Sequence, residues 1–389
     1  MITDKQTNFV YFSSLIKENL NYLPFWKRLE LLLDKNKIGY GFIEGTRDIW
    51  CRDYMPIQQD LNSFIQYEYF PDYYLSPKHI SKLTIPSETK ISDKISINKS
   101  KLIIDGGNII KSKNIAILTD KILTDNSNFG EEFILSTLKQ ELSIENIYLI
   151  PKAPYEMTGH ADGMVRLLNE KDLLFSDYSN ESKSWQQKMD NALNKTGLNL
   201  IPFPTEFVNE KNNDGDSTAK GVYINFAQIG NTILLPQFNL ETDKIALEKT
   251  EELFPKCNVI PVNANEIAND GGVLNCITWN IKIQTVGNLN THDKKTPNQL
   301  EQEKFVYNKL DFYFSTFDYY LIAQGFEIAW NSNTNNFIGD GDLKNMVYHF
   351  LDEKIDRNPI PQNIVDKTID LIIEYLESIG QYGFDISKN

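Results

Sequence analysis

The stretch DGGNIIKSKNIAIL, residues 105–118, decides the fold because it joins three features in one short segment. An acidic residue, Asp105, stands before a Gly-Gly pair, which is common turn chemistry. An apolar run of the kind found in strands follows within a few residues. The stretch therefore predicts a turn that presents a polar side chain at the start of a β-strand.

Three other stretches repeat this arrangement, and a fourth repeats it loosely. They are TGHADGMVRLL (158–168), YINFAQIGNTILLPQF (223–238), DGGVLNCITWNI (270–281) and, loosely, IWCRDYMPIQ (49–58). Amphipathic segments lie before or between them, with apolar residues three and four positions apart, as in helices. These segments are residues 25–35, 130–142, 181–195 and 241–254.

The spacing of these stretches predicts an α/β fold built as a closed ring of repeated modules. Asp53 and Asp105 are 52 residues apart, Asp105 and His160 are 55 apart, and His160 and Cys276 are 116 apart, about two intervals. A period of roughly 50 to 60 residues with strands and a helix is typical of repeated modules rather than one open sheet. In such a ring, the equivalent loop of each module meets at one central site. We expect four loops to supply functional residues and one to be mainly structural.

The pattern changes after about residue 290. We predict a catalytic domain over residues 1–290 and a helical, acidic extension over residues 291–389. Residues 301–389 contain fifteen Asp and Glu against seven Lys and Arg, so more than half of the net charge of −14 lies there. The extension is expected to pack against the catalytic domain. A surface for homo-oligomers, a lid and a docking site for a partner are the alternatives.

Within this extension, three segments are expected to be helical: residues 300–330, 342–355 and 361–380. In the last of these, Pro361 and Gly380 are suitable start and stop signals. Residues 331–342, which end in GDGD, are expected to form a loop and a turn rather than a calcium site, because no complete set of ligands follows.

Composition excludes several classes of protein. The chain has 389 residues, 41% of them hydrophobic, and a pI near 4.9, which is unfavourable for a nucleic-acid-binding protein. No apolar run is long enough for a membrane span, and the first twenty residues lack the pattern of a signal peptide. Three cysteines form neither a disulfide framework nor a metal-ligand spacing. We expect a soluble protein of a reducing compartment, the cytoplasm.

His160 and Cys276 are the strongest candidates for chemistry. His160 lies in the Gly-rich segment GHADG with Asp162 two residues later, and in a strand residues two apart face the same way. Cys276 follows a Gly-Gly turn and precedes a strand-like run, where a thiol is accessible. Cys51 and Cys257 are expected to be packing residues, as free cysteines usually are.

Asp53 and Asp105 complete the candidate set. Each alone is weak, because an Asp beside a turn is common. One Cys, one His and three Asp on evenly spaced loops form a more specific combination. Arg47 and Asp48, which precede Asp53, have no expected role beyond structural pairing at the edge of the module.

These segments resemble a known family. In order over about residues 9–285, WCRDYMP, DGGNI, GHADG, NFAQIGNTILLPQF and GGVLNCITWN are similar to the agmatine deiminase and bacterial peptidyl-arginine deiminase family of guanidine-modifying enzymes. The resemblance implies the pentein fold, a five-module α/β propeller of ββαβ units with the nucleophile in the last module. It assigns the nucleophile to Cys276, the acid–base group to His160 and catalytic support to Asp105. Asp53 and Asp162 would bind the guanidinium.

The implied reaction is hydrolysis of a guanidino compound to a ureido product and ammonia through a covalent Cys intermediate. It requires no metal or organic cofactor. A planar guanidinium suits two carboxylates, and both the substrate cation and a protonated His160 are expected to favour the thiolate of Cys276.

An agmatine-like small alkylguanidine is the expected substrate. Peptidyl-arginine deimination, amidino transfer, a non-catalytic guanidinium-binding protein and a Cys protease are the alternatives. The sequence departs from the family pattern at several positions, and two of them are single residues within the quoted segments. Met55 stands where glycine is usual, and Asn275 stands where His is common before the nucleophile.

Overall fold

The computed structural model describes most of the first 283 residues and parts of the remainder. Described are residues 1–283 except 76–78, 91–94, 155, 209, 213–214 and 216, together with 302, 306, 322–323, 325–326, 329, 340–354 and 362–378. The contacts divide the chain into two compact units. One comprises Met1–Leu32, Gly41–Ile91 and Ile95–Lys282, and the other Leu33–Tyr40, Ser92–Lys94 and Ile283–Asn389.

The segment at residues 105–118 starts a module of three strands and a helix. β6 (Ile110–Lys111) and β7 (Ile115–Thr119) form an antiparallel hairpin, and β7 pairs in parallel with β8 (Asn146–Ile150). Parallel neighbours need a crossover connection. Here α5 (Glu131–Leu142) supplies it, and it buries Ile134, Leu138 and Leu142, which share one helical face.

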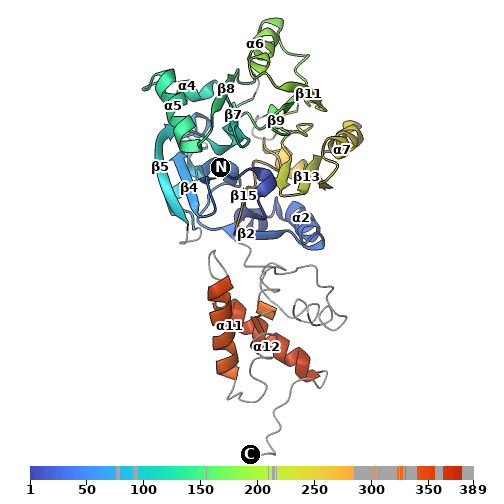
Figure 1. The fold of residues 1–389 in the computed structure, drawn as a ribbon. Helices are drawn as coiled ribbons and strands as arrows, with labels where there is room; N and C mark the ends of the chain where they lie inside the picture. The colour runs from blue at the N-terminus through green and yellow to red at the C-terminus, as the bar shows by residue number, and fades with distance from the viewer. Residues whose placement is uncertain are drawn as a thin grey trace, which may run out of the picture. The chain divides into compact units, whose positions relative to one another are not determined.

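Four further sheets have the same three-stranded form, and Figure 1 shows all five arranged around a common centre with the main helices outside. Three of these modules have an α-helix between their last two strands, and the described residues of the first have none there. The four modules are β3 (Ile57–Gln58), β4 (Ser63–Glu68) and β5 (Ser96–Ile103); β9 (Val165–Leu167), β10 (Asp172–Ser176), α6 (Lys183–Asn194) and β11 (Asn199–Phe203); β12 (Ala227–Ile229), β13 (Thr232–Gln237), α7 (Thr242–Leu253) and β14 (Asn258–Asn263); and β15 (Trp279–Ile281), β1 (Phe9–Ser13), α2 (Leu23–Lys35) and β2 (Gly39–Ile43). The predicted repeat and its four amphipathic helices are confirmed.

The last of these sheets closes the ring. β15 pairs antiparallel with β1, with Tyr11 opposite Trp279, so one sheet joins two distant parts of the sequence. The Trp279 ring lies 5.4 Å from that of Tyr11 and 5.7 Å from that of Phe64 on β4. Its indole Nε1 donates a hydrogen bond to the Pro56 carbonyl at 2.7 Å. Trp279 therefore links the closing sheet to the next module.

The N-terminal segment contacts the inner side of several modules. It includes the short helix η1 (Asp4–Gln6). Lys111 Nζ donates to the Ile2 carbonyl at 2.7 Å, Lys5 Nζ donates to the Leu168 carbonyl at 2.8 Å, and the Gly230 N–H donates to the Asp4 carbonyl at 3.0 Å. These bonds attach residues 2–5 to three different sheets.

The crossover between β4 and β5 differs from the other four. Its described residues contain no α-helix and form instead η2 (Asp72–Tyr74), η3 (Ile80–Lys82) and η4 (Pro86–Glu88). Asp72 pairs with the buried Lys121, and the Thr84 hydroxyl donates to Asp48 at 2.7 Å. This crossover is therefore fixed to neighbouring modules by polar contacts rather than by an apolar helical face.

In the second unit, α11 (Asp340–Lys354) and α12 (Gln362–Ser378) confirm two predicted helices. Val347, Phe350, Val365, Ile369 and Ile372 belong to its apolar core. The turn expected at GDGD is wrong, because α11 already begins at Asp340. Most of the helix expected over residues 300–330 lies outside the described residues. In the described part of the chain, no helix is both long and apolar enough to cross a bilayer.

The remaining short helices lie in loops. They are α1 (Leu15–Glu18), α3 (Cys51–Tyr54), η5 (Gly106–Asn108), α4 (Lys121–Asp125) and α8 (Asn265–Ala268). Two of them, α3 and η5, immediately precede the first strand of a module. Helix α3 contains Asp53, and η5 begins directly after Asp105.

Candidate active site

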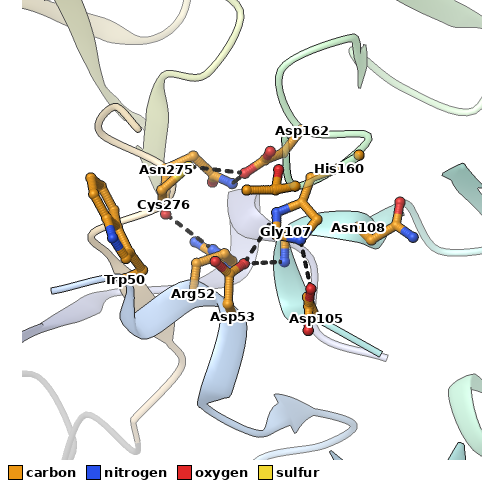
Figure 2. A network of polar contacts seen from close by, with 12 residues as sticks. Trp50, Arg52, Asp53, Asp105, Gly107, Asn108, His160, Asp162, Asn275 and Cys276 are labelled. Atoms are coloured by element: carbon orange, nitrogen blue, oxygen red, sulfur yellow. Dashed lines mark hydrogen bonds and ion pairs between the residues drawn. The ribbon is translucent and has the colours of Figure 1, made fainter. Parts of the chain in front are cut away.

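The loops before β3, β9, β12 and β15 line one pocket of about 470 Å³. The pocket is lined by Asp53 before β3, His160 and Asp162 before β9, Asn225 before β12 and Cys276 before β15. Asp105, before β6, is bonded to His160 (Figure 2). The structure thus brings together all five residues that the sequence singled out. Their chemical roles remain predictions.

Gly107 lies at the centre of the charged groups. Its N–H donates to Asp53 Oδ1 at 2.9 Å, and its carbonyl accepts from the Asp162 N–H at 3.2 Å (Figure 2). A Cβ at this position would lie 2.6 Å from Asp53 Oδ1, 2.8 Å from His160 Nδ1 and 3.3 Å from Asp162 Oδ2. Only glycine lets the three side chains approach one another here.

His160 is buried between two carboxylates. Its Nε2 lies 2.9 Å from Asp105 Oδ2, and its Nδ1 lies 3.6 Å from Asp53 Oδ1. Burial lowers the pKa of His160, but the charge of Asp53 and the hydrogen bond and charge of Asp105 outweigh it and raise the pKa to about 10. The imidazole is therefore protonated on both nitrogens at neutral pH, with Nε2 hydrogen-bonded to Asp105.

Asp53 is buried in the one-turn helix α3. Burial raises the pKa of its carboxyl group, His160 opposes this effect, and the charges of Asp105 and Asp162 add to it. The carboxyl groups of Asp53, Asp105 and Asp162 thus surround one imidazole, and they repel one another when they are ionised. A cation entering the pocket would relieve this repulsion and favour the ionised form of Asp53.

His160 and Asp162 converge for a reason that differs from the expected one. The prediction that both side chains lie on one strand is wrong, because β9 begins only at Val165. Residues 161–164 form a turn, and just before it the Glu156 carboxylate accepts hydrogen bonds from the backbone N–H groups of Thr158, Gly159 and His160. This turn, rather than strand alternation, places both side chains at the pocket.

Asp162 and Cys276 are linked by the side chains of Asn225, which the sequence did not single out, and Asn275, which it singled out only as a departure from the family pattern. Asn275 Nδ2 donates to Asp162 Oδ2 at 2.7 Å (Figure 2), and the Asn275 N–H donates to Asn225 Oδ1 at 3.1 Å. Cys276 Sγ lies 3.6 Å from Asp162 Oδ2 and 3.5 Å from Asn225 Oδ1. The loop expected to be mainly structural therefore supplies Asn225 to the site.

The thiol of Cys276 lies in the pocket but is not activated in this state. Burial raises its pKa, and the carboxylates of Asp162 and Asp53 raise it further. The expectation that protonated His160 favours the thiolate has no support here, because these two anions are the charges that act on the sulfur. A bound cation would offset them and lower the thiol pKa.

The other two cysteines lie away from this chemistry. Cys51 is fully buried, and its Sγ donates to the Ile277 carbonyl at 2.9 Å. Cys257 does not line the pocket, and burial raises its pKa. Met55 is also buried and lines a separate small cavity, so the departure from glycine at this position makes no contact with the site.

Arg47 and Asp48 each have a structural partner, but they do not pair with each other. Arg47 pairs with Glu88 at 2.7 Å. Asp48 accepts hydrogen bonds from the Thr84 hydroxyl and from the Trp50 N–H, which fixes the backbone that leads into α3.

Two aromatic residues also shape the site. Trp50 lines the pocket, and its indole packs so closely on Gly272 that no side chain fits there. Tyr73, from the unusual crossover, donates a hydrogen bond from its hydroxyl to Asp105 Oδ2 at 3.2 Å, and the centre of its ring lies 6.0 Å from that of the His160 ring in a T-shaped arrangement. Trp50 lies in the WCRDYMP segment but has no expected role there, and Tyr73 lies in none of the quoted segments.

This arrangement suits a planar cation. Carboxylates bind guanidinium groups in bidentate geometry, and a thiol and a protonated imidazole lie beside them. Within the described residues, no group of three or more His, Cys, Asp or Glu side chains is arranged to bind a metal ion.

A ring of five three-stranded modules around one such pocket defines an α/β propeller with a thiol, an imidazole and carboxylates at its centre. The family model of the Porphyromonas-type peptidyl-arginine deiminases matches residues 30–281, more than half of the chain. The chain belongs to this family.

Named relatives agree with this assignment. A Listeria monocytogenes protein, provisionally named agmatine deiminase 1, is 26% identical over 211 residues, which cover 46% of this chain and 58% of that protein. The chain thus spans just over half the length of the curated relatives it matches.

Solved structures show the same fold. A Cys→Ser variant of Campylobacter jejuni agmatine deiminase with substrate bound has a TM-score of 0.58 and 17% identity, covering 73% of this chain and 96% of that one. The Enterococcus faecalis agmatine deiminase has a TM-score of 0.54 and 16% identity, covering 72% and 94%.

The contacts of Gly107 generate a first prediction. Gly107→Ala should separate Asp53 from His160, lower the free energy of unfolding by about 1–3 kcal/mol and lower the pKa of His160. Urea denaturation and NMR titration of the imidazole C–H measure the two effects. Gly163→Ala is the matched control, since its Cβ would meet only Val222 Cγ1, at 3.7 Å. An unchanged His160 titration in Gly107→Ala would contradict the prediction.

The electrostatics of the thiol generate a second prediction. Asp162→Asn removes an anion that raises the Cys276 pKa, so the thiolate fraction at pH 8 should rise by about tenfold for each unit by which the pKa falls. The rate of Cys276 alkylation by iodoacetamide, followed by mass spectrometry, measures it. Cys257 in the same sample is the internal control. A slower or unchanged rate at Cys276 would show that Asp162 does not suppress the thiolate.

Proposed function

We propose that the protein hydrolyses a guanidino group to a ureido group and ammonia, with Cys276 as the nucleophile. One observation supports this above all others: a thiol, a protonated imidazole and an excess of carboxylates meet in one pocket. The carboxylates argue against a Cys protease, because a neutral peptide bond would leave them without a cationic partner. The family to which the chain belongs is named for a deiminase, which agrees.

Binding comes first in the proposed mechanism. Asp53 and Asp162 accept hydrogen bonds from the guanidinium nitrogens, and the substrate cation neutralises the carboxylates that raise the thiol pKa. The thiol then loses its proton to solvent, and the thiolate attacks the guanidinium carbon. Activation thus depends on the substrate, which protects the free thiol from other reactions.

His160 serves both halves of the reaction. Its Nε2 is held by Asp105, so Nδ1, on the side of Asp53, faces the reacting centre. Nδ1 donates a proton to the departing nitrogen, the C–N bond breaks, and ammonia leaves a covalent amidino-thioether. Neutral His160 then accepts a proton from the attacking water, the C–S bond breaks, and the ureido product leaves. Asp105 and Tyr73 keep the imidazole in place.

The substrate is proposed to be an agmatine-like small alkylguanidine. The pocket of about 470 Å³ is of the size that accepts small molecules, and the named relatives point to agmatine. Trp50 gives one wall an aromatic face, to which the alkyl chain or the cation can be attracted.

A panel of guanidino compounds tests the proposal. Agmatine, free arginine, methylated arginines and arginine peptides are incubated with the unaltered protein and with Cys276→Ala, and ammonia and ureido products are measured. Agmatine should be turned over fastest, and Cys276→Ala should lose at least about a thousandfold in kcat. Preference for arginine peptides would correct the substrate. Equal ammonia release by both proteins would refute the proposed function.

The pH profile tests the role of Asp105. Asp105 raises the pKa of His160, so Asp105→Asn should lower it, and the alkaline fall in kcat/KM should move to lower pH as the imidazolium is lost earlier. Asp172→Asn, on β10 and outside the pocket, is the matched control. If the alkaline limb of Asp105→Asn coincided with that of the unaltered protein, Asp105 would not tune the acid.

A further inference from the structure

Asp162 receives its hydrogen bond from the Asn275 amide, whose orientation depends on the groups on both of its sides. A rotation of the Asn275 side chain by half a turn would exchange its donor and its acceptor. The carbonyl oxygen Oδ1 would then face the Asp162 carboxylate, and the two would repel each other. Within the described residues, Asp162 has no ion-pair partner that could compensate for this loss.

Arg166 sets this orientation. Its Nη1 donates to Asn275 Oδ1 at 3.3 Å, and because a guanidinium is a donor only, the oxygen must face Arg166. Nδ2 is thereby left to donate to Asp162 at 2.7 Å. The hydrogen bond from Arg166 to Asn275 Oδ1 thus keeps Nδ2 facing the Asp162 carboxylate.

Asp4 holds Arg166 in turn. Arg166 is 5% exposed, and its Nη2 pairs with Asp4 Oδ2 at 2.6 Å. Its Nη1 also donates to the Phe226 carbonyl at 3.2 Å, and its guanidinium lies 4.6 Å from the centre of the Phe226 ring. Burying a guanidinium without an anion is costly, so Asp4 is required to keep it there.

Asp4 is itself fixed and ionised. Its Oδ1 accepts from Asn280 Nδ2 at 3.1 Å. Burial raises the pKa of Asp4, but the cations Arg166, Lys111 and Arg52 lower it to about 2 overall. The N-terminal segment therefore delivers a permanent negative charge to the side of Asn275 opposite the substrate pocket.

We infer that Arg166 and Asp4 are positioning residues for the candidate active site, acting through Asn275 on Asp162. The inference rests on the proposed function in one respect, that Asp162 binds the substrate guanidinium. A guanidinium of the protein thus prepares the site for a guanidinium of the substrate, without contacting it. The effect should fall on KM rather than on kcat, because Asp162 binds the substrate and does not transfer the proton.

The kinetic test is a double-mutant cycle with agmatine as the substrate. Arg166→Gln and Asn275→Ala should each raise KM by about ten- to a hundredfold, the range for losing a hydrogen bond to a buried charge, with a smaller change in kcat. The double variant should exceed Asn275→Ala by no more than about twofold, since both act through one amide. Arg166→Lys should recover part of the loss through its charge. Effects that multiply would overturn the inference.

A second measurement does not depend on activity. In protein labelled with ¹⁵N-asparagine, the Asn275 side-chain amide is identified by its loss in Asn275→Ala. Its resonances should shift, and its hydrogen exchange should quicken, in Arg166→Gln and in Asp4→Asn. Arg28→Gln, which removes the exposed Arg28–Glu266 pair, is the matched control and should leave the amide unchanged.

The two failures can be told apart. Absence of turnover of any guanidino compound by the unaltered protein counts against the proposed function, while the Asn275 amide still reports on the network. An amide with unchanged shifts and exchange in Arg166→Gln overturns the inference, whatever the activity. Circular dichroism shows whether Arg166→Gln is folded. If it is unfolded, the Asn275 amide is measured in Asp4→Asn, which keeps Arg166, and unchanged shifts and exchange there overturn the inference.

Discussion

The site depends on the burial of three carboxylates around a single imidazole. Asp53, Asp105 and Asp162 are each less than 10% exposed, and their mutual repulsion is only partly balanced by protonated His160. Such an arrangement would be unstable on a mobile loop, because each unpaired buried charge costs several kcal/mol. The propeller makes it possible by fixing each loop just before a strand and by placing Gly107 among them, which has no side chain and whose N–H donates to Asp53.

The opposite side of this cluster has the reverse charge. Arg52, Lys111 and Arg166 line a second, smaller cavity in which Asp4 is the main counter-charge. Burial lowers the pKa of Lys111 to about 8, with Asp4 opposing this effect and Arg52 and Arg166 adding to it. The middle of the ring thus has an acidic zone toward the pocket and a basic zone behind it. Neutral Asn275 lies between them and bonds to both.

The sequence predicted what local signals encode and missed what arises between modules. The helices over residues 131–142, 183–194 and 242–253 follow from apolar periodicity, and the candidate residues follow from turn chemistry at a regular spacing. Asn225 could not be found this way, because a lone asparagine has no signature until its partners are known. Asn275 stood out only as a departure from the family pattern, and its bonds to Asp162 and Arg166 were not foreseen. The prediction that His160 and Asp162 face one pocket was right, but its reason was wrong. A turn preceded by hydrogen bonds to Glu156, rather than a strand, places the two side chains.

Closure of the ring through β1 and β15 determines when the site can exist. A chain emerging from the ribosome presents β1 first, and this strand lacks its antiparallel neighbour until residues 279–281 have been made. Cys276 comes just before that strand, whereas Asp53, Asp105 and His160 are made much earlier. The thiol is therefore the last group to arrive and comes with the strand that completes the first sheet. No shorter nascent chain contains a nucleophile together with an assembled pocket.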